Sequence, residues 1–135
     1  MKLSEDTIKE LIDAAIAVRE CAYAPYSEFK VGAALLGESG TVYTGCNVEN
    51  ASYGATICAE RSAVVKAVSA GEQAFPAIAI VYDEKEKAIP CGMCRQVLSE
   101  FNNAMTVIMA NTAGEFDVNT LQELLPKSFE KSSLK

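Results

Sequence analysis

Apolar residues recur every three or four positions near the start of the chain, at Ile8, Leu11, Ile12, Ala15 and Ile16. This spacing places them on one face of a helix, so it predicts a helix from Ser4 to about Cys21. Ser4 is a suitable N-cap because acidic residues follow it. The segment Tyr23–Ser27 contains a proline and ends the helix.

The next apolar segments are short and predict strands. Lys30–Leu36 and Thr41–Cys46 are separated by Gly37–Gly40, a turn signal, so they predict a hairpin. Asn47–Thr56 follows neither period and is predicted to be a loop. Ala77–Tyr82 is a continuous apolar run, which indicates a strand buried on both faces.

Helices and strands alternate along the rest of the chain. A second helix is predicted from about Cys58 to Ala70, with Gly71 at its C-terminal stop. A third helix begins just after Pro90. Met105–Ala110 predicts a fourth strand and Gly114–Val118 a short fifth.

The C-terminal part carries one further helix signal. Thr120 and Glu123 match a capping box for a short helix that runs through Leu125 and that Pro126 ends. Together, the interleaved helices and buried strands indicate a layered α/β domain in which helices cover a mixed sheet. The opening hairpin argues against a purely parallel sheet.

Composition narrows the possible partners and the compartment. A net charge of −6 with scattered Lys and Arg argues against a nucleic-acid partner. No stretch is apolar enough to span a membrane, and the charged N-terminus lacks the apolar core of a signal peptide. These features predict a cytoplasmic protein, so its five cysteines are expected to stay reduced.

The chain contains no histidine. Most zinc sites and most general bases use histidine. Any metal site in this chain must therefore be built from thiolates and carboxylates, and any proton shuttle must be another titratable side chain.

Three cysteines stand out by their placement. Cys58 lies at the start of the second predicted helix, and Cys91 and Cys94 lie at the start of the third. One helix and one strand fit between them, so both helix starts can meet at one sheet edge. Helix N-termini favour thiolates, which bind metal ions. Three such ligands suggest an open zinc site that keeps a position for water.

Glu60 follows Cys58 by two residues, so its carboxylate can reach a metal-bound water without binding the metal. The alternative is a favourable charge near the helix dipole. Arg61 can donate to the sulfurs and withdraw negative charge, or it can be an exposed helix arginine. Cys21 and Cys46 are expected to be small buried apolar groups.

Two segments, 57–61 (ICAER) and 90–96 (PCGMCRQ), resemble the zinc-binding signature of cytidine deaminases. Four more resemble the short, homotetrameric branch of this family: 22–27 (AYAPYS), 29–34 (FKVGAA), 45–52 (GCNVENAS) and 124–129 (LLPKSF). The likeness covers nearly the whole chain. It implies a three-layer α/β/α sandwich with a mixed, about five-stranded sheet. It also implies one catalytic domain over residues 1–129 and a polar tail over 130–135.

The resemblance also implies the activity and the zinc site. The expected reaction is zinc-dependent hydrolysis of cytidine and 2'-deoxycytidine to uridine and 2'-deoxyuridine, with release of ammonia, in pyrimidine salvage. Cys58, Cys91 and Cys94 resemble the ligands of one zinc ion per subunit, and Glu60 resembles the general acid and base.

The substrate-binding residues are also implied by the resemblance. Asn47 and Glu49 resemble the ribose-binding pair, and Phe29 resembles an aromatic that packs on the pyrimidine. Phe129 resembles an aromatic that closes the pocket of a neighbouring subunit, which places active sites at the subunit interfaces of a homotetramer.

Other functions stay open from the residues themselves. A related zinc deaminase could act on free cytosine, on a nucleotide or on an aminated antibiotic nucleoside. A structural zinc module would need a fourth ligand, with Cys21 or Cys46 as candidates. A thiol redox protein would cycle Cys91 and Cys94 as a disulfide and would need no zinc.

Overall fold

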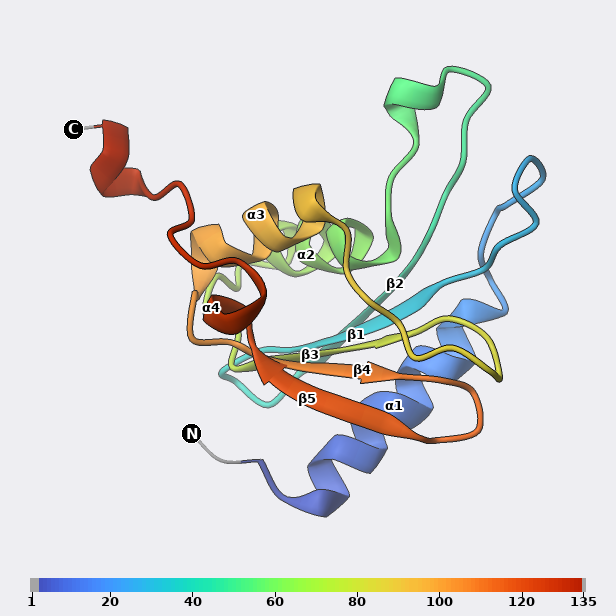
Figure 1. The fold of residues 1–135 in the computed structure, drawn as a ribbon, viewed down its shortest axis with the longest axis horizontal. Helices are drawn as coiled ribbons and strands as arrows, with labels where there is room; N and C mark the ends of the chain where they lie inside the picture. The colour runs from blue at the N-terminus through green and yellow to red at the C-terminus, as the bar shows by residue number, and fades with distance from the viewer. Residues whose placement is uncertain (1–2, 135) are drawn as a thin grey trace.

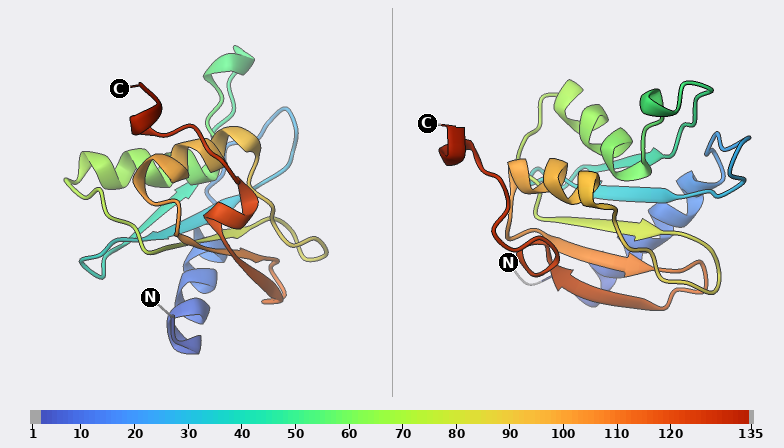
Figure 2. Two further views of the ribbon diagram at one scale, coloured as in Figure 1. Left: turned by 60° about the vertical axis from the view of Figure 1, so that its left-hand side comes forward. Right: turned by 45° about the horizontal axis from the view of Figure 1, so that its top comes forward.

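The computed structural model describes residues 3–134, which form three layers (Figure 1). A five-stranded sheet, in the order β2-β1-β3-β4-β5, lies between helix α1 on one face and helices α2 and α3 on the other (Figure 2). The strands are β1 Gly32–Leu36, β2 Val42–Cys46, β3 Ala77–Val81, β4 Thr106–Ala110 and β5 Phe116–Thr120. The α-helices are α1 Glu5–Arg19, α2 Ala59–Ser69, α3 Gly92–Phe101 and α4 Leu121–Leu124. Short 3-10 helices lie at Tyr53–Ala55 and Lys131–Leu134. The expected α/β/α sandwich with a mixed, five-stranded sheet is confirmed.

Strand pairing explains why the sheet is mixed. β1 pairs antiparallel with both β2 and β3, and β4 pairs antiparallel with β5. β3 and β4 are parallel, and α3 makes the crossover between them. Because β1 and β3 are antiparallel, the start of β1 and the end of β3 lie at the same edge of the sheet.

Each face of the sheet has its own apolar core. Leu11, Ile12 and Ala15 of α1 pack on one face with residues such as Ile108. The other face packs against α2 and α3 around Phe75 and a set of fully buried side chains. All five residues of β3 are buried, as expected for a central strand covered on both faces.

Two glycines let helices lie directly on the sheet. A Cβ added at Gly32 would lie 2.0 Å from the carbonyl oxygen of Ala15 in α1. A Cβ added at Gly45 would lie 2.4 Å from the backbone nitrogen of Ala63 in α2. Only a residue without a side chain allows such close backbone approach, so these positions fix the depth of both helix layers.

The predicted elements are all present, with shifted ends. The fifth strand was expected over Gly114–Val118, but it begins at Phe116 because a tight turn occupies the preceding residues. In that turn the Asn111 side-chain oxygen accepts from two backbone amides, and Gly114 has φ +89°. The capping box of Thr120 and Glu123 is confirmed.

Cys21 and Cys46 differ from the packing expected of them. Cys21 is exposed in the turn that follows α1, and Cys46 is only half-buried at the end of β2. The helix ends at Arg19, so Cys21 does not lie on the apolar face where a longer helix would place it.

Within residues 3–134, no helix is both long enough and apolar enough to cross a bilayer.

Candidate metal centre and substrate cavity

The three predicted cysteines meet at the adjacent starts of α2 and α3. Cys58 is the N-cap of α2 and Cys91 is the N-cap of α3, while Cys94 is fully buried in the first turn of α3. Their Sγ atoms all lie within 4.8 Å of one another. The two helices start at the same end of the sheet because the strands that precede them along the chain, β2 and β3, both run toward that end (Figure 1).

The geometry and charge of this cluster fit a zinc ion. Tetrahedral zinc with sulfur ligands at about 2.3 Å needs sulfur atoms about 3.8 Å apart, so a small contraction of the side chains suffices. A hydrogen bond from Cys94 is the main cause that lowers the pKa of Cys58 to about 5, and it raises the pKa of Cys94. The pair therefore carries a thiolate, the form that binds metals.

The cluster offers three ligands in the part of the chain that the structure describes. Neither Cys21 nor Cys46 belongs to it, so the fourth ligand that a structural zinc module requires is not supplied by them. Three protein ligands and a remaining position for water are typical of catalytic zinc sites.

Arg61 lies against the sulfurs rather than in solvent. Its Nη2 donates to Cys58 Sγ at 3.3 Å, and this contact leads the causes that raise the pKa of the guanidinium. Its Nε is buried with no hydrogen-bond partner among residues 3–134. The interpretation of Arg61 as an exposed helix arginine is therefore wrong, and its charge offsets part of the thiolate charge.

Glu60 points into the interior beside the cluster. Its side chain is 4% exposed, and burial is the main cause that raises its pKa to about 7. The negative charge of Cys58 raises it further. A carboxyl group that titrates near neutral pH can accept and return a proton with little cost in either direction.

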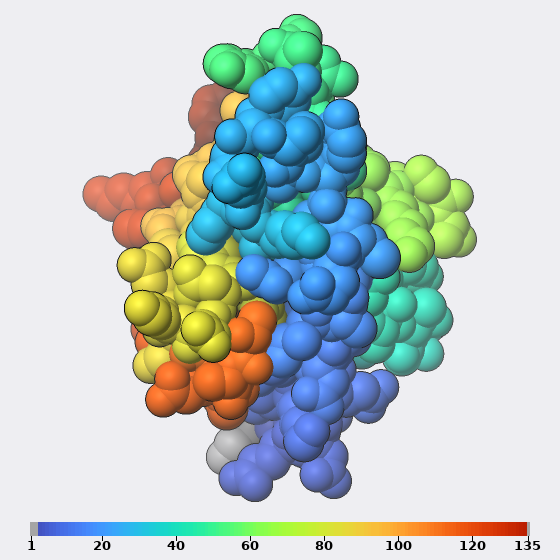
Figure 3. Space-filling view, turned by 90° about the vertical axis from the view of Figure 1, so that its right-hand side faces the viewer, coloured from blue at the N-terminus to red at the C-terminus, as the bar shows by residue number. Residues whose placement is uncertain are grey.

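A cavity of about 220 Å³ lies next to Glu60 and the cysteine cluster. Twelve residues line it: Ser27, Phe29, Val31, Asn47, Glu49, Thr56, Ile57, Cys58, Ala59, Glu60, Tyr82 and Cys91. They come from loops and from the start of α2, at the end of the sheet where β1 begins and β3 ends. Figure 3 faces this end of the molecule. The lining brings together two cysteines of the cluster, the buried Glu60 and the predicted sugar-binding pair.

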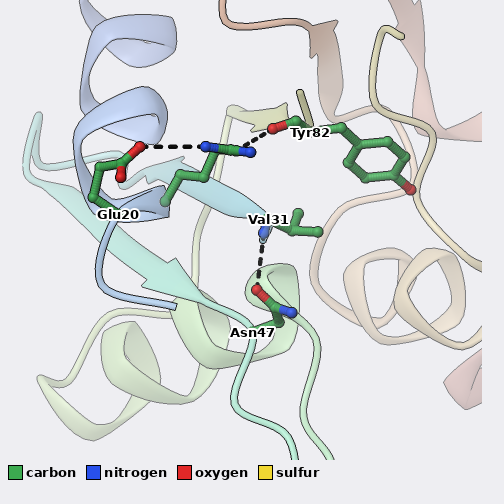
Figure 4. A network of polar contacts seen from close by, with 5 residues as sticks. Glu20, Val31, Asn47 and Tyr82 are labelled. Carbon is green, nitrogen blue, oxygen red and sulfur yellow. Dashed lines mark hydrogen bonds and ion pairs between the residues drawn. The ribbon is translucent and has the colours of Figure 1, made fainter. Parts of the chain in front are cut away.

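Asn47 and Glu49 line the cavity while they also organise its walls. The Asn47 side chain accepts from the Val31 backbone amide at 2.8 Å (Figure 4). It also donates to the Phe29 carbonyl at 2.8 Å. Glu49 accepts from the Tyr26 and Ser27 amides at 3.0 and 3.1 Å and from the Ser27 hydroxyl. The Ser27 hydroxyl is the main cause that lowers the pKa of Glu49, so this carboxylate is held ionised.

Phe29 and Phe129 lie in different surroundings. Phe29 lines the cavity, is 40% exposed and meets Tyr82 edge to face, with ring centroids 5.0 Å apart. Phe129 is 58% exposed and does not line the cavity of its own chain. Its carbonyl accepts from Gln96 Nε2 at 2.8 Å, which ties the C-terminal segment to α3.

Sequence reasoning missed Tyr82 and Ser27 as cavity residues. Tyr82 follows the last residue of β3, its hydroxyl donates to the Ile89 carbonyl, and its own carbonyl accepts from Arg19 Nε (Figure 4). The carboxyl end of a buried strand is a common place for binding residues, and that signal would have found Tyr82. No sequence signal identifies Ser27, because its role depends on Glu49.

Comparisons with known proteins identify the family of the chain. Residues 5–110 match the family model described as the cytidine and deoxycytidylate deaminase zinc-binding region. A cytidine deaminase of Sporosarcina psychrophila is 49% identical over 128 residues, which cover 94% of both chains. A cytidine deaminase of Halalkalibacterium halodurans is 52% identical over 120 residues, which cover 88% of this chain and 91% of that one.

Solved structures give the same result. The crystal structure of a cytidine deaminase from Burkholderia pseudomallei superposes with a TM-score of 0.86 at 47% identity. The match covers 94% of this chain and all of that one.

The chain belongs to the zinc-dependent cytidine and deoxycytidylate deaminase family. It is an enzyme of this class, and the cysteine cluster is consistent with one zinc ion as its cofactor.

Proposed function

We propose that the chain deaminates cytidine and 2'-deoxycytidine by hydrolysis, giving uridine and 2'-deoxyuridine with release of ammonia, in pyrimidine salvage. One observation carries the proposal: three cysteine sulfurs at two helix starts lie beside a buried carboxyl group at the base of a cavity. The proposed zinc ligands are Cys58, Cys91 and Cys94. The zinc ion, when bound, supplies a Lewis acid that makes water acidic enough to react near neutral pH.

Glu60 is the proposed proton carrier. It accepts a proton from the attacking water and gives a proton to N3 of the pyrimidine ring. The same carboxyl then accepts the proton of the new C4 hydroxyl and donates it to the amino group, which leaves C4 as ammonia. Each acceptance is followed by a donation, so one side chain can serve all the transfers, and a pKa of about 7 suits both directions.

Asn47 and Glu49 are the proposed partners of the sugar hydroxyls. The Asn47 amide uses one of its two N–H groups on the Phe29 carbonyl, which leaves one for a hydroxyl. The Glu49 carboxylate has about four acceptor positions, and three protein donors occupy it, so one stays free. The pair can thus satisfy a hydroxyl that both donates and accepts.

The cavity favours an uncharged nucleoside over a nucleotide. Its lining contains two carboxylates, Glu49 and Glu60, and no Lys or Arg. A phosphate group would meet negative charge without a cationic partner. Phe29 offers an aromatic face to the pyrimidine at the cavity wall, where edge-on contact with Tyr82 holds the ring.

We further propose a cytoplasmic homotetramer whose sites are completed by a neighbouring subunit. The support is the exposed Phe129, which belongs to neither of the two apolar cores formed by residues 3–134. A ring from a neighbour over the cavity would exclude water and strengthen the electrostatics beneath it. Residues 1–129 form the proposed catalytic domain, and 130–135 form a polar tail.

The experiment is an ultraviolet assay with cytidine, 2'-deoxycytidine, cytosine and cytidine monophosphate, with zinc counted on the same sample. We expect turnover of the two nucleosides and little of the others. Glu60→Gln keeps the side-chain shape and should retain zinc while turnover falls about 10²–10⁴-fold. Turnover of that variant at the parent rate would rule out the proton role, and absence of nucleoside turnover by the parent chain would rule out the function.

A further inference from the structure

The three cysteines of the cluster are held to very different degrees. Cys94 is fully buried in α3, and Cys58 is half-buried and accepts from Arg61 at 3.3 Å. Cys91 is exposed, and as the N-cap of α3 it makes no side-chain capping bond. Packing alone therefore does not fix the position of the Cys91 sulfur, and another restraint is needed.

Arg95 holds the backbone on both sides of Cys91. Its Nε donates to the Pro90 carbonyl at 2.8 Å, and its backbone amide donates to the Cys91 carbonyl at 3.0 Å. The peptide groups before and after Cys91 are thus both bonded to one residue. Rotation about the Cys91 backbone, which would swing its sulfur away from the other two, would break at least one of these bonds.

A second nitrogen of the Arg95 guanidinium contacts helix α4. Arg95 Nη1 donates to the Leu124 carbonyl in the last turn of α4 at 2.7 Å. α4 is fixed in turn by the fully buried Leu121, whose amide donates to the Met105 carbonyl at 2.8 Å. The capping box at Thr120 closes the start of this helix. A continuous series of contacts therefore leads from the core to the loop that carries Cys91.

We propose that Arg95 is a positioning residue for the metal site, which bridges the Pro90 and Leu124 carbonyls and so holds the exposed Cys91 sulfur at the cluster. The role rests on the proposed zinc ligands. It needs the planar guanidinium, because a lysine ammonium is a single point that cannot hold two carbonyls in this geometry. Arg95 does not line the cavity, so it acts through Cys91 and not on the substrate.

The test measures Zn²⁺ binding to the metal-free full-length chain in competition with a chromophoric chelator. Arg95→Met removes both side-chain bonds and should raise the zinc dissociation constant about 10- to 100-fold, the range for loss of an outer partner of a metal ligand. Arg95→Lys should give an intermediate value. With Co²⁺ as the probe, the thiolate-to-metal absorption per bound ion should be weaker in Arg95→Met.

Asn102→Ala is the matched control at the opposite end of α3. Asn102 Nδ2 donates to the Phe75 carbonyl at 3.0 Å, so this variant also loses a bond from a side chain to a distant carbonyl. We expect it to lower the unfolding temperature of the metal-free and zinc-loaded chains alike and to leave the zinc dissociation constant unchanged. A purely structural Arg95 would behave in the same way.

The proposal is overturned if Arg95→Met and Arg95→Lys bind Zn²⁺ as tightly as the parent chain and keep its Co²⁺ spectrum. If Arg95→Met does not fold, Arg95→Lys decides the matter alone by the same two measurements. A parent chain that binds no Zn²⁺ overturns the proposed function together with this role. A parent chain that binds Zn²⁺ and deaminates cytidine, beside Arg95 variants of equal affinity, overturns the role of Arg95 only.

Discussion

Substitution of Gly45 by alanine tests whether helix α2 lies on the sheet as closely as the structure requires. The added Cβ would lie 2.4 Å from the Ala63 backbone nitrogen and 2.6 Å from the Ala59 carbonyl oxygen. Ordinary contacts of a Cβ begin at 3.4 Å, so the helix must move by 3.4 − 2.4 = 1.0 Å. Both neighbours are backbone atoms, so no side-chain rotation can relieve the overlap.

The cost follows from this overlap. Overpacking of a well-packed core typically destabilises by about 1–3 kcal/mol, and a clash with backbone belongs at the upper end. A loss of about 3 kcal/mol corresponds to a fall of about 10 °C in the unfolding temperature of a chain of this size. The lower backbone entropy of alanine in the unfolded chain offsets only about 0.4–1 kcal/mol of this loss.

The same shift should reach the metal site. α2 carries Cys58 at its N-cap, with Glu60 and Arg61 in its first turn, so a helix displaced from the sheet displaces all three. We expect Gly45→Ala to bind zinc more weakly as well as to unfold earlier. If the metal site did not depend on the position of α2, Gly45→Ala would lower the unfolding temperature of the chain and leave its affinity for zinc unchanged.

Thermal unfolding followed by circular dichroism, with and without zinc, measures both effects. Gly54→Ala is the matched control, because a Cβ at Gly54 meets nothing within 4 Å and its φ is not positive. It should leave the unfolding temperature almost unchanged. An unfolding temperature for Gly45→Ala equal to that of Gly54→Ala would refute the close approach of α2 to β2.

Three further predictions concern the site and the pH dependence of stability. Cys91→Ala should abolish the one-zinc stoichiometry, and full occupancy by metal analysis would contradict its assignment as a ligand. Arg61→Gln should keep zinc and lower kcat about 10- to 100-fold, and an unchanged kcat would mean that its contact with Cys58 does not matter for the reaction. Bonds from the Ser39 amide and hydroxyl lower the pKa of Glu72 below its ordinary 4.5, so its stabilisation is present above pH 4.5 and lost as the pH falls through the folded-state pKa. Glu72→Gln should therefore flatten the acid side of the stability curve, and an unchanged acid slope in thermal unfolding at several pH values would show that these bonds contribute nothing.

Local signals explain why most of the fold could be predicted from the sequence. The period of α1, the apolar run of β3 and the capping box at Thr120 each depend on neighbours within a few residues. The proximity of the three cysteines could also be predicted. In a layered α/β domain, helices that follow strands of the same direction start at the same edge of the sheet.

The remaining features depend on contacts between distant segments. Tyr23 pairs with Val48, and Val48 pairs with Ile57, as isolated bridges outside the named strands. The 63-residue separation between Arg19 and the Tyr82 carbonyl shows the same dependence. Hydrophobic period contains no information on such pairs, so these contacts could not be predicted from the pattern of apolar residues.

Charge unites the main features of the metal centre. With no histidine in the chain, three thiolates must serve, and with Zn²⁺ they give a net charge of 2 − 3 = −1. An ionised Glu60 beside them would add a second negative charge in a buried place, which explains why burial and Cys58 both raise its pKa. The Arg61 contact removes charge from the sulfur side, and the raised pKa of Glu60 removes it from the carboxyl side. A site of thiolates can therefore keep its metal electrophilic only if both groups stay where α2 places them. The close packing of α2 against Gly45 fixes the position of Glu60 and Arg61, so it is needed for the chemistry as well as for the fold.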